Sequence, residues 1–194
     1  MTWQISLRQT FLSLVATIAI AAPASTTLAY EWVVQPANSR IGFEYQGDGT
    51  PKSGVFSRFE GTGQFDPDSL SGAELLLTID TSSIDLNDDL ASGFAQSAEW
   101  FDSKNHPNVI YRLIDLTPIE GTRYAARGQL TIRGVERPIT SEINLAFDED
   151  LAAAAGSLVI VRADYLLGVG PSAIFVEIGP DVIVSFDLRA ARTE

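Results

Sequence analysis

The side chains that could carry acid–base or nucleophilic chemistry are few. The chain of 194 residues contains one histidine, His106, and no cysteine. A lone imidazole without cysteine cannot build the usual zinc sites, and no thiolate nucleophile is available. No serine lies in a G-x-S-x-G elbow or next to the histidine, so the recognised serine-hydrolase pattern is missing. We therefore expect no enzyme activity, no metal site and no cofactor.

Carboxylates are the other candidates, and they gather at predicted turns. Asp85, Asp88 and Asp89 form one group, and residues 148–150 form another. Acids at exposed turns usually cap helices or bind backbone N–H groups locally. We interpret both groups as structural. A lipid hydrolase or isomerase with Asp164 or His106 as its base remains an open hypothesis.

The charge balance is strongly acidic. Thirteen Lys and Arg residues stand against 25 Asp and Glu residues, which gives a formal net charge of −12 at pH 7. Such a protein repels phosphate backbones and anionic bilayers, and no basic cluster offsets that repulsion. We expect no nucleic-acid partner.

The first residues predict a secretory signal peptide. Arg8 precedes an apolar run from Phe11 to Ala22, which is too short to span a bilayer as a stable helix. Small residues at 27–29 suit a signal peptidase, so we expect cleavage after Ala29, with Ala24 as a competing site. The prediction is a signal peptide over 1–29 and one domain over 30–194. We expect a periplasmic protein without stable membrane insertion after cleavage.

Most of the remaining chain predicts short strands. Residues 41–45 and 139–147 alternate apolar and polar side chains, which is typical of a sheet with one buried face. Turn signals are expected at 46–51, 66–68, 118–122, 134–138, 148–150, 168–171 and 179–181. The predicted strands are 32–35, 40–46, 54–65, 73–80, 109–115, 124–132, 139–147, 158–165, 174–178 and 182–188. This all-β pattern favours an antiparallel sandwich or an up-and-down barrel of about eight strands.

One long segment, residues 90–111, interrupts the strands. The acids and amide at 87–89 are types that cap helices, and Pro107 ends any helix that reaches it. We predict a helical crossover that covers one end of the β core. Leu90, Phe94 and either Ala98 or Phe101 fall on one face at helical spacing.

The residues expected to face the interior are aromatic or aliphatic. A bore of eight strands is just wide enough to be filled by side chains or to hold one small ligand. Alternation alone leaves a filled core and a ligand tunnel both open. The expected residues are Phe43, Tyr45, Phe56, Phe59, Leu75, Leu77, Ile79, Tyr111, Ile143 and Leu145, with Phe94, Trp100 and Phe101 from the crossover.

Several short motifs follow one another along the chain. The most specific is Gly128–Pro138, which reads G-x-L-T-I-x-G-x-x-x-P. The others are Trp32, Asn38–Phe43, Gly54–Phe56, Phe59–Gly61, Ser83–Asp85, Leu90–Ser92, Trp100–Asp102, His106–Pro107 and Arg162–Tyr165. In this order, and over nearly the whole chain after the leader, they resemble the YceI-like family of exported polyisoprenoid-binding proteins.

The resemblance implies a lipocalin-like antiparallel barrel with a helical element. It also implies a periplasmic carrier that holds a long-chain isoprenoid or other amphiphilic lipid along the barrel axis, without catalysis. An isoprenoid quinone or a polyprenyl lipid would be a ligand and not a cofactor. We expect polar side chains at the mouth to contact the head group, with Tyr124, Arg162 and Asp164 as candidates beside Tyr45 and Tyr111.

Three positions depart from the family pattern. Asn38 and the segment 46–48 stand where the family often has histidines, and 165–168 replaces a phenylalanine–glycine pair. These departures predict a different head-group preference and a different cavity wall. An alternative function is a filled barrel that binds an envelope or membrane redox complex through its acidic surface. The sequence leaves a homodimer open.

Overall fold

A computed structural model describes residues 29–171 and 177–193. The predicted signal peptide lies almost wholly outside these residues, as does most of the strand predicted over 174–178. The strands are β1 (Tyr30–Val34), β2 (Arg40–Gly47), β3 (Thr50–Phe56), β4 (Phe59–Asp66), β5 (Ser69–Asp80), β6 (Ile84–Asp85), β7 (Asn108–Glu120), β8 (Arg123–Ile132), β9 (Val135–Asp148), β10 (Leu151–Val161) and β11 (Ile178–Arg192). The helices are α1 (Asp89–Ala95) and the short 3-10 helices η1 (Pro36–Asn38), η2 (Thr81–Ser83) and η3 (Arg162–Tyr165).

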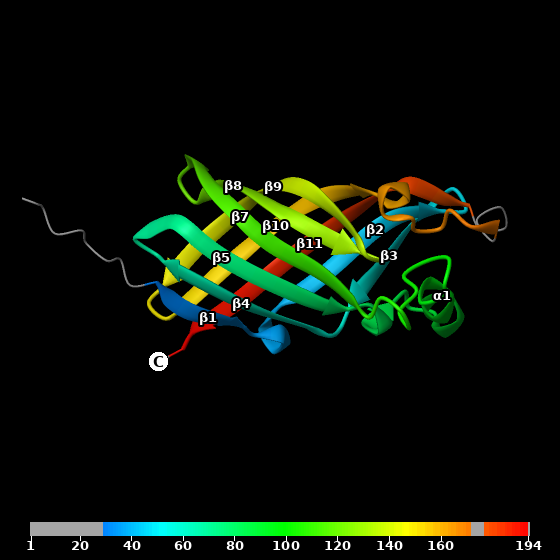
Figure 1. The fold of residues 1–194 in the computed structure, drawn as a ribbon, viewed down its shortest axis with the longest axis horizontal. Helices are drawn as coiled ribbons and strands as arrows, with labels where there is room; N and C mark the ends of the chain where they lie inside the picture. The colour runs from blue at the N-terminus through cyan, green and yellow to red at the C-terminus, as the bar shows by residue number, and fades with distance from the viewer. Residues whose placement is uncertain (1–28, 172–176, 194) are drawn as a thin grey trace, which may run out of the picture.

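The strands form one antiparallel sheet that closes on itself (Figure 1). Its order is β1-β4-β5-β7-β8-β9-β10-β11, and β1 pairs with β11 to complete an eight-stranded barrel. β2, β3 and β6 continue from β11 at the end of the barrel that carries α1. The prediction of an all-β barrel with a helical insertion is confirmed, and the sandwich is excluded.

The alternation of apolar and polar residues decides which side chains face inward. On β9, Ser141, Ile143 and Leu145 are buried while the residues between them are exposed, as the sequence predicts. On β8, Leu130 and Ile132 are 6% and 4% exposed. These side chains belong to apolar clusters inside the barrel.

The strand predicted over 54–65 is in fact two strands. The break falls at Ser57 and Arg58, whose backbone N–H groups donate to the carbonyl and hydroxyl of Ser83 at 3.2 and 3.1 Å. The chain therefore leaves the ladder to bind η2. β3 also begins at Thr50, inside the predicted loop, because Asp48 and Gly49 make a tight turn with φ of 50° and 72°.

Other boundaries also differ from the prediction. The turn expected over 134–138 is wrong, because Arg133 and Gly134 alone reverse the chain, with φ of 51° and 74°. The turn expected at 118–122 occupies only residues 121–122, because β7 continues to Glu120 with a register shift. β11 runs through the turn expected at 179–181, also with a register shift. β10 includes the alanine-rich residues 151–157, whose low strand propensity hid them. It stops at Val161, where η3 replaces the predicted strand end.

The predicted helical crossover exists, but its helix is short. Asp88 caps α1, since its carboxylate accepts a hydrogen bond from the Ala91 N–H at 2.8 Å. The helix ends at Ala95, well before Pro107. The chain then folds back: the Phe101 N–H donates to the Ala95 carbonyl at 3.0 Å, and Asp102 adopts a φ of 48°. Turns, and not the proline, end the helix.

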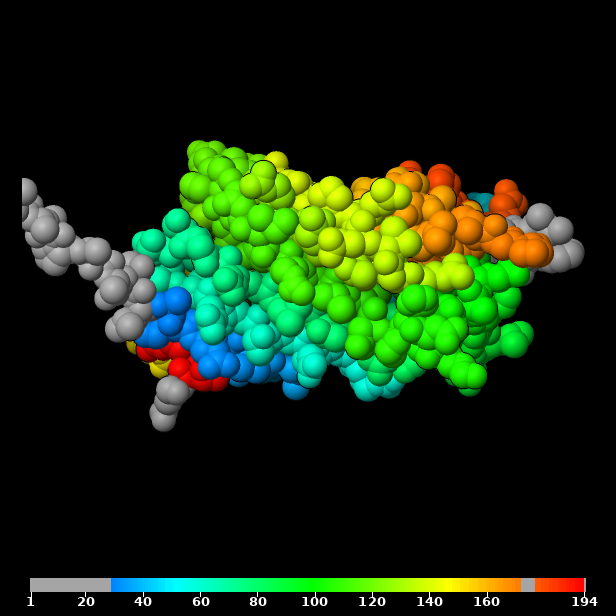
Figure 2. Space-filling view, viewed as in Figure 1, coloured from blue at the N-terminus to red at the C-terminus, as the bar shows by residue number. Residues whose placement is uncertain are grey.

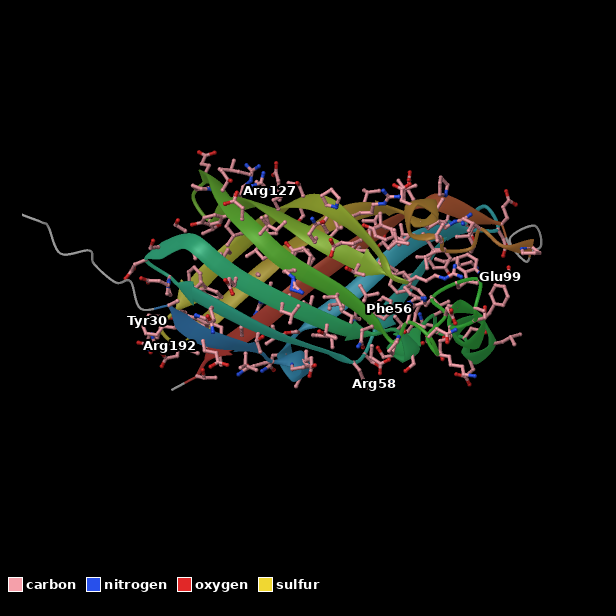
Figure 3. All side chains as sticks on the ribbon, viewed as in Figure 1. Tyr30, Phe56, Arg58, Glu99, Arg127 and Arg192 are labelled. Carbon is pink, nitrogen blue, oxygen red and sulfur yellow. The ribbon has the colours of Figure 1, made fainter. Side chains whose placement is uncertain are left out.

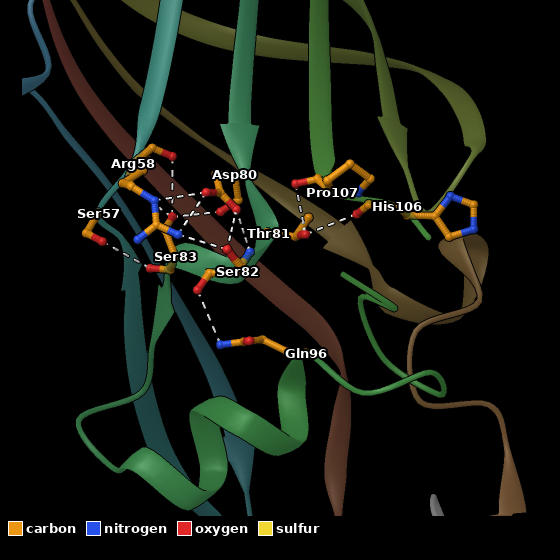
Figure 4. A network of polar contacts seen from close by, with 9 residues as sticks. All are labelled: Ser57, Arg58, Asp80, Thr81, Ser82, Ser83, Gln96, His106 and Pro107. Carbon is orange, nitrogen blue, oxygen red and sulfur yellow. Dashed lines mark hydrogen bonds and ion pairs between the residues drawn. The ribbon is translucent and has the colours of Figure 1, made fainter. Parts of the chain in front are cut away.

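A polar network holds this crossover against the barrel (Figure 4). Thr81 is fully buried, and its hydroxyl lies 3.0 Å from the carbonyl oxygens of both His106 and Pro107. The Gln96 side chain donates to the Ser82 carbonyl at 3.3 Å. Short polar side chains in η2 thus satisfy backbone groups that would otherwise be buried without a partner.

The barrel ladder is incomplete between β9 and β10. The two strands pair only from Ile143–Gly156 to Asp148–Leu151. Toward the α1 end they separate, and an outer groove of about 430 Å³ lies between them. Tyr165 from η3 lines this groove and is 3% exposed. Its ring fills part of the wall where the ladder is missing.

Gly128, in the most specific sequence motif, leaves space for the ring of Tyr111. A Cβ at this position would lie 2.6 Å from the Tyr111 Cζ atom. We expect Gly128→Ala to lower the free energy of unfolding by about 1–3 kcal/mol, because the ring must leave its place. Urea denaturation measures the change.

Two controls accompany this substitution. Gly93→Ala places a methyl group in open space on α1 and should be neutral or stabilising by roughly 0.5–1 kcal/mol. In a Tyr111→Leu background, Gly128→Ala should cost less than in the wild type, and the remaining cost comes from the Arg112 carbonyl oxygen, 2.7 Å from the added Cβ. An equal cost in both backgrounds would show that the ring is not the reason for the glycine.

Candidate functional site

A cavity of about 820 Å³ runs along the inside of the barrel. This volume lies within the ~300–1,000 Å³ of small-molecule sites. On the face seen in Figure 2, side chains of β5, β7 and β8 form a continuous outer surface. The interior is therefore a tunnel inside the sheet and not a cleft on that face.

Every residue predicted for the interior lines this cavity except Phe59. Phe59 is buried at 8% exposure, but it packs into the core cluster and pairs with Ile79 instead of facing the open space. The crossover contributes Phe94, Trp100 and Phe101 to the wall, as expected. The structure thus brings together residues from five strands and the crossover, although ligand binding by them stays a prediction.

Two of the three head-group candidates lie elsewhere. Tyr124 is on β8 and packs beside the Ala126 and Ile143 cluster, outside the cavity wall. Asp164 lines the outer groove between β9 and β10. Arg162 does line the cavity.

Sequence reasoning missed part of the wall. The alternation rule applied to β8 and β11 would have found Leu130, Ile132, Val184 and Phe186, because they sit at every second position. The alanines at 126, 152 and 154 also line the cavity, but small side chains give no hydrophobic signal.

The charged residues of the wall gather at the end where α1 lies. They are Asp48 in the β2–β3 turn, Lys52 on β3, Asp88 before α1 and Arg162 on η3. Figure 3 shows Phe56 of β3 at this end and Tyr30 and Arg192 at the other. Charged side chains need water, so we take the α1 end as the mouth of the tunnel.

Arg162 is held by backbone carbonyl oxygens. Its guanidinium donates to those of Leu167, Gly168, Ile178 and Gly179 at 2.8, 2.8, 3.0 and 3.0 Å. These four bonds tie residues 167–168 to the start of β11. Arg162 therefore acts mainly as a clamp at the mouth.

Trp100 of the crossover contacts both Arg162 and Gly168 at the mouth. The Arg162 guanidinium lies 5.6 Å from the ring centre of Trp100. Gly168 approaches that ring so closely that a Cβ there would lie 2.5 Å from its Cη2 atom. The Gly168 N–H donates to the Glu99 carbonyl at 2.8 Å. The crossover and the segment after η3 thus form one side of the mouth together.

Besides Ser141 and the charged residues at the mouth, two tyrosines put hydroxyl groups into the wall. Burial raises the pKa of Tyr111 to about 12. Burial, and then the charge of Asp48, raise the pKa of Tyr45. Among the described residues, the Tyr111 hydroxyl has no hydrogen-bond partner. The tunnel can therefore offer a neutral donor, but no fixed charge, in its middle.

Metal and acid–base chemistry find little support in this geometry. Within 29–171 and 177–193, no three His, Asp or Glu side chains stand where they could hold a metal ion. His106 is not part of the cavity wall; its ring lies near Gly134 in the β8–β9 turn. No helix in these ranges is long and apolar enough to cross a membrane.

Known proteins share this sequence and fold. The UPF0312 protein ECA1782 of Pectobacterium atrosepticum is 29% identical over 142 residues, which cover 72% of this chain and 73% of the relative. Protein YceI of Salmonella arizonae is 32% identical over 92 residues, which cover 47% of this chain and 48% of that protein.

Solved structures show the same barrel. BcnA of Burkholderia cenocepacia has a TM-score of 0.74 at 26% identity, over 80% of this chain and 98% of that one. A polyisoprenoid binding domain from Saccharophagus degradans has a TM-score of 0.69 at 18% identity, over 86% and 100% of the two chains. The family profile described as YceI-like domain matches residues 32–190. With its closed barrel, inner tunnel and helical crossover, this chain belongs to the YceI-like family.

Proposed function

We propose that the protein binds and carries a long-chain isoprenoid or similar amphiphilic lipid, with the tail inside the barrel. The observation that carries this proposal is the cavity itself, which is almost wholly apolar along its length and charged at one end. An amphiphile matches that polarity, because its tail needs an apolar wall and its head group needs water. The polyisoprenoid binding domain of Saccharophagus degradans has the same fold, which supports this ligand class.

The energy of tail burial is sufficient for binding without a charged anchor. Burying about ten methylene groups at ~0.8 kcal/mol each contributes roughly 8 kcal/mol before the costs of ordering and lost translation. Asn38 and Gln46, which differ from the family pattern, do not reduce this free energy of tail burial. Neither side chain lines the cavity, whereas Gly47 and Asp48 do.

The proposal includes a periplasmic location and a non-catalytic role. The location rests on the sequence of residues 1–29 alone. The role rests on the family and on the placement of the two candidate bases, since neither His106 nor Asp164 reaches the tunnel wall. The alternative of a filled barrel that binds a protein partner is disfavoured by the open volume of about 820 Å³.

Native mass spectrometry of the protein purified from its own source tests the ligand class. Organic extraction should release an isoprenoid or another single-tailed amphiphile. If the protein has only its ligand-free mass and takes up neither added farnesol nor solanesol, the proposal is contradicted. That result would favour the alternative of a barrel that binds a protein partner.

A bulky residue in the middle of the tunnel should block the tail. Ile143 on β9 lines the cavity and is 8% exposed, so Ile143→Trp fills space that the tail needs. We expect the affinity for a prenyl alcohol to fall at least about tenfold, which corresponds to 1.4 kcal/mol. Ile114→Trp on β7 is the control, because Ile114 is 49% exposed and outside the wall. Equal affinities of the two variants would place the tail elsewhere.

A bound tail should also change the titration of Tyr111. Its pKa is about 12 against an ordinary 10.0, so its neutral form adds stability below pH 10 that is lost as the pH rises toward 12. Covering the ring with lipid removes more water and should raise this pKa further. The measurement is phenolate absorbance of the wild type minus that of Tyr111→Phe, with and without farnesol. The exposed Tyr30→Phe serves as control, and a lowered or unchanged midpoint would count against a tail beside Tyr111.

A further inference from the structure

The end of the tunnel opposite α1 contains three aromatic rings in contact. Trp32 and Phe65 stack with ring centres 4.8 Å apart and an angle of 7° between the planes. Phe147 lies 5.6 Å from Phe65 and 6.0 Å from Trp32. We call these three residues the aromatic floor.

The aromatic floor crosses the whole bore. Phe65 is on β4 and Phe147 is on β9, and three strands separate β4 from β9 in either direction around the barrel. Their rings therefore come from opposite walls and meet in the middle. A tail that enters at the α1 end cannot pass between rings whose centres are 5.6 Å apart.

The floor is also held firmly. Trp32 is 1% exposed, one of the most buried large side chains in the described chain. Its indole N–H donates to the Phe65 carbonyl at 3.1 Å. This bond ties β4 to β1 where the floor begins, in addition to the backbone pairing of the two strands.

The two ends of the tunnel differ in polarity. The charged wall residues Asp48, Lys52, Asp88 and Arg162 lie at the α1 end. Near the floor the wall consists of apolar side chains such as Phe65, Leu70 and Ala152. A ligand with one polar head and one apolar tail therefore has a single favourable orientation, with the tail end against the floor.

We infer that the aromatic floor sets the length of tail that the barrel accepts, an inference that rests on the proposed lipid binding. A tail that is too long keeps apolar surface in water at the mouth, and one that is too short leaves part of the wall without contacts. The best ligand is the one whose tail spans the distance from the charged mouth to Phe65 and Phe147. None of the three aromatic residues is needed to hold a head group.

Variants that move the floor test this inference. Phe65→Ala removes a ring that lines the tunnel, and Phe147→Ala removes the ring packed against it, so each should lengthen the tunnel. Ala154→Leu adds bulk to a wall position between mouth and floor and shortens it. Phe59→Ala is the matched control, since Phe59 is a buried phenylalanine on the same strand as Phe65 but belongs neither to the aromatic floor nor to the tunnel wall.

The measurement is native mass spectrometry of each protein with an equimolar series of geraniol, farnesol, geranylgeraniol and solanesol. We expect the ratio of longer to shorter bound alcohol to rise at least about tenfold on removal of either floor ring, and to fall with Ala154→Leu. Phe59→Ala should keep the wild-type ratio. If Phe147→Ala does not fold, Phe147→Leu and Ala154→Leu carry the same comparison.

Two outcomes would overturn the inference, and they can be told apart. Binding of the series with the same length preference in floor variants and in Phe59→Ala would reject the floor as a length stop but keep lipid binding. Binding of no member of the series by any of the proteins would reject the proposed function itself.

Discussion

The pairing of β1 with β11 is the constraint on which the rest of the structure depends. It joins Trp32–Val34 to Ala190–Arg192 and turns an open sheet into a barrel. Closure satisfies backbone groups that an open edge would leave unpaired, and it gives the sheet an inside. β11 can close the barrel because its 15 residues pair with β10 along nearly their whole length, with β1 at one end and with β2 at the other.

Closure alone would not leave a cavity, because a bore of eight strands is narrow enough for side chains to fill. Small inward residues keep it open. Alanines at 126, 152 and 154 line the wall, and Gly128 lets the ring of Tyr111 lie close to the sheet. Aromatic rings gather at the crossover and at the floor, and those of Tyr111 and Phe186 line the wall between them. The distribution of side-chain size along the strands thus decides where the barrel is empty.

Strict alternation on β2, β5 and β9 is a strong local signal, and it predicted the strands and most of the lining. It left a sandwich and a barrel both open, and the family resemblance pointed to the barrel. The sequence patterns misplaced features that depend on distant contacts. The break at Ser57 and Arg58 exists because of hydrogen bonds to Ser83, and no local pattern reveals it. The inner alanines of β10 carry no hydrophobic signal.

The head-group candidates also show that local sequence does not reveal contacts between distant residues. Arg162 lies at the mouth, but the sequence could not say that four carbonyl oxygens already occupy its guanidinium. Tyr124 packs on the cluster of Ala126, Ile143 and Leu145, and Asp164 lies on η3 beside the outer groove, so neither is part of the tunnel wall. The floor escaped notice because the contact between Phe65 and Phe147 joins strands far apart in sequence.

Both ends of the described chain lie at the barrel end away from α1 (Figure 1). The Thr193 N–H donates to the Glu31 carbonyl at 2.9 Å, so the two ends are neighbours there. A surface, a reporter domain or a second binding module joined to either end would therefore hold the barrel with its mouth facing outward. The fold is thus well arranged for immobilised sensors of hydrophobic molecules, in which attachment and recognition occupy opposite poles.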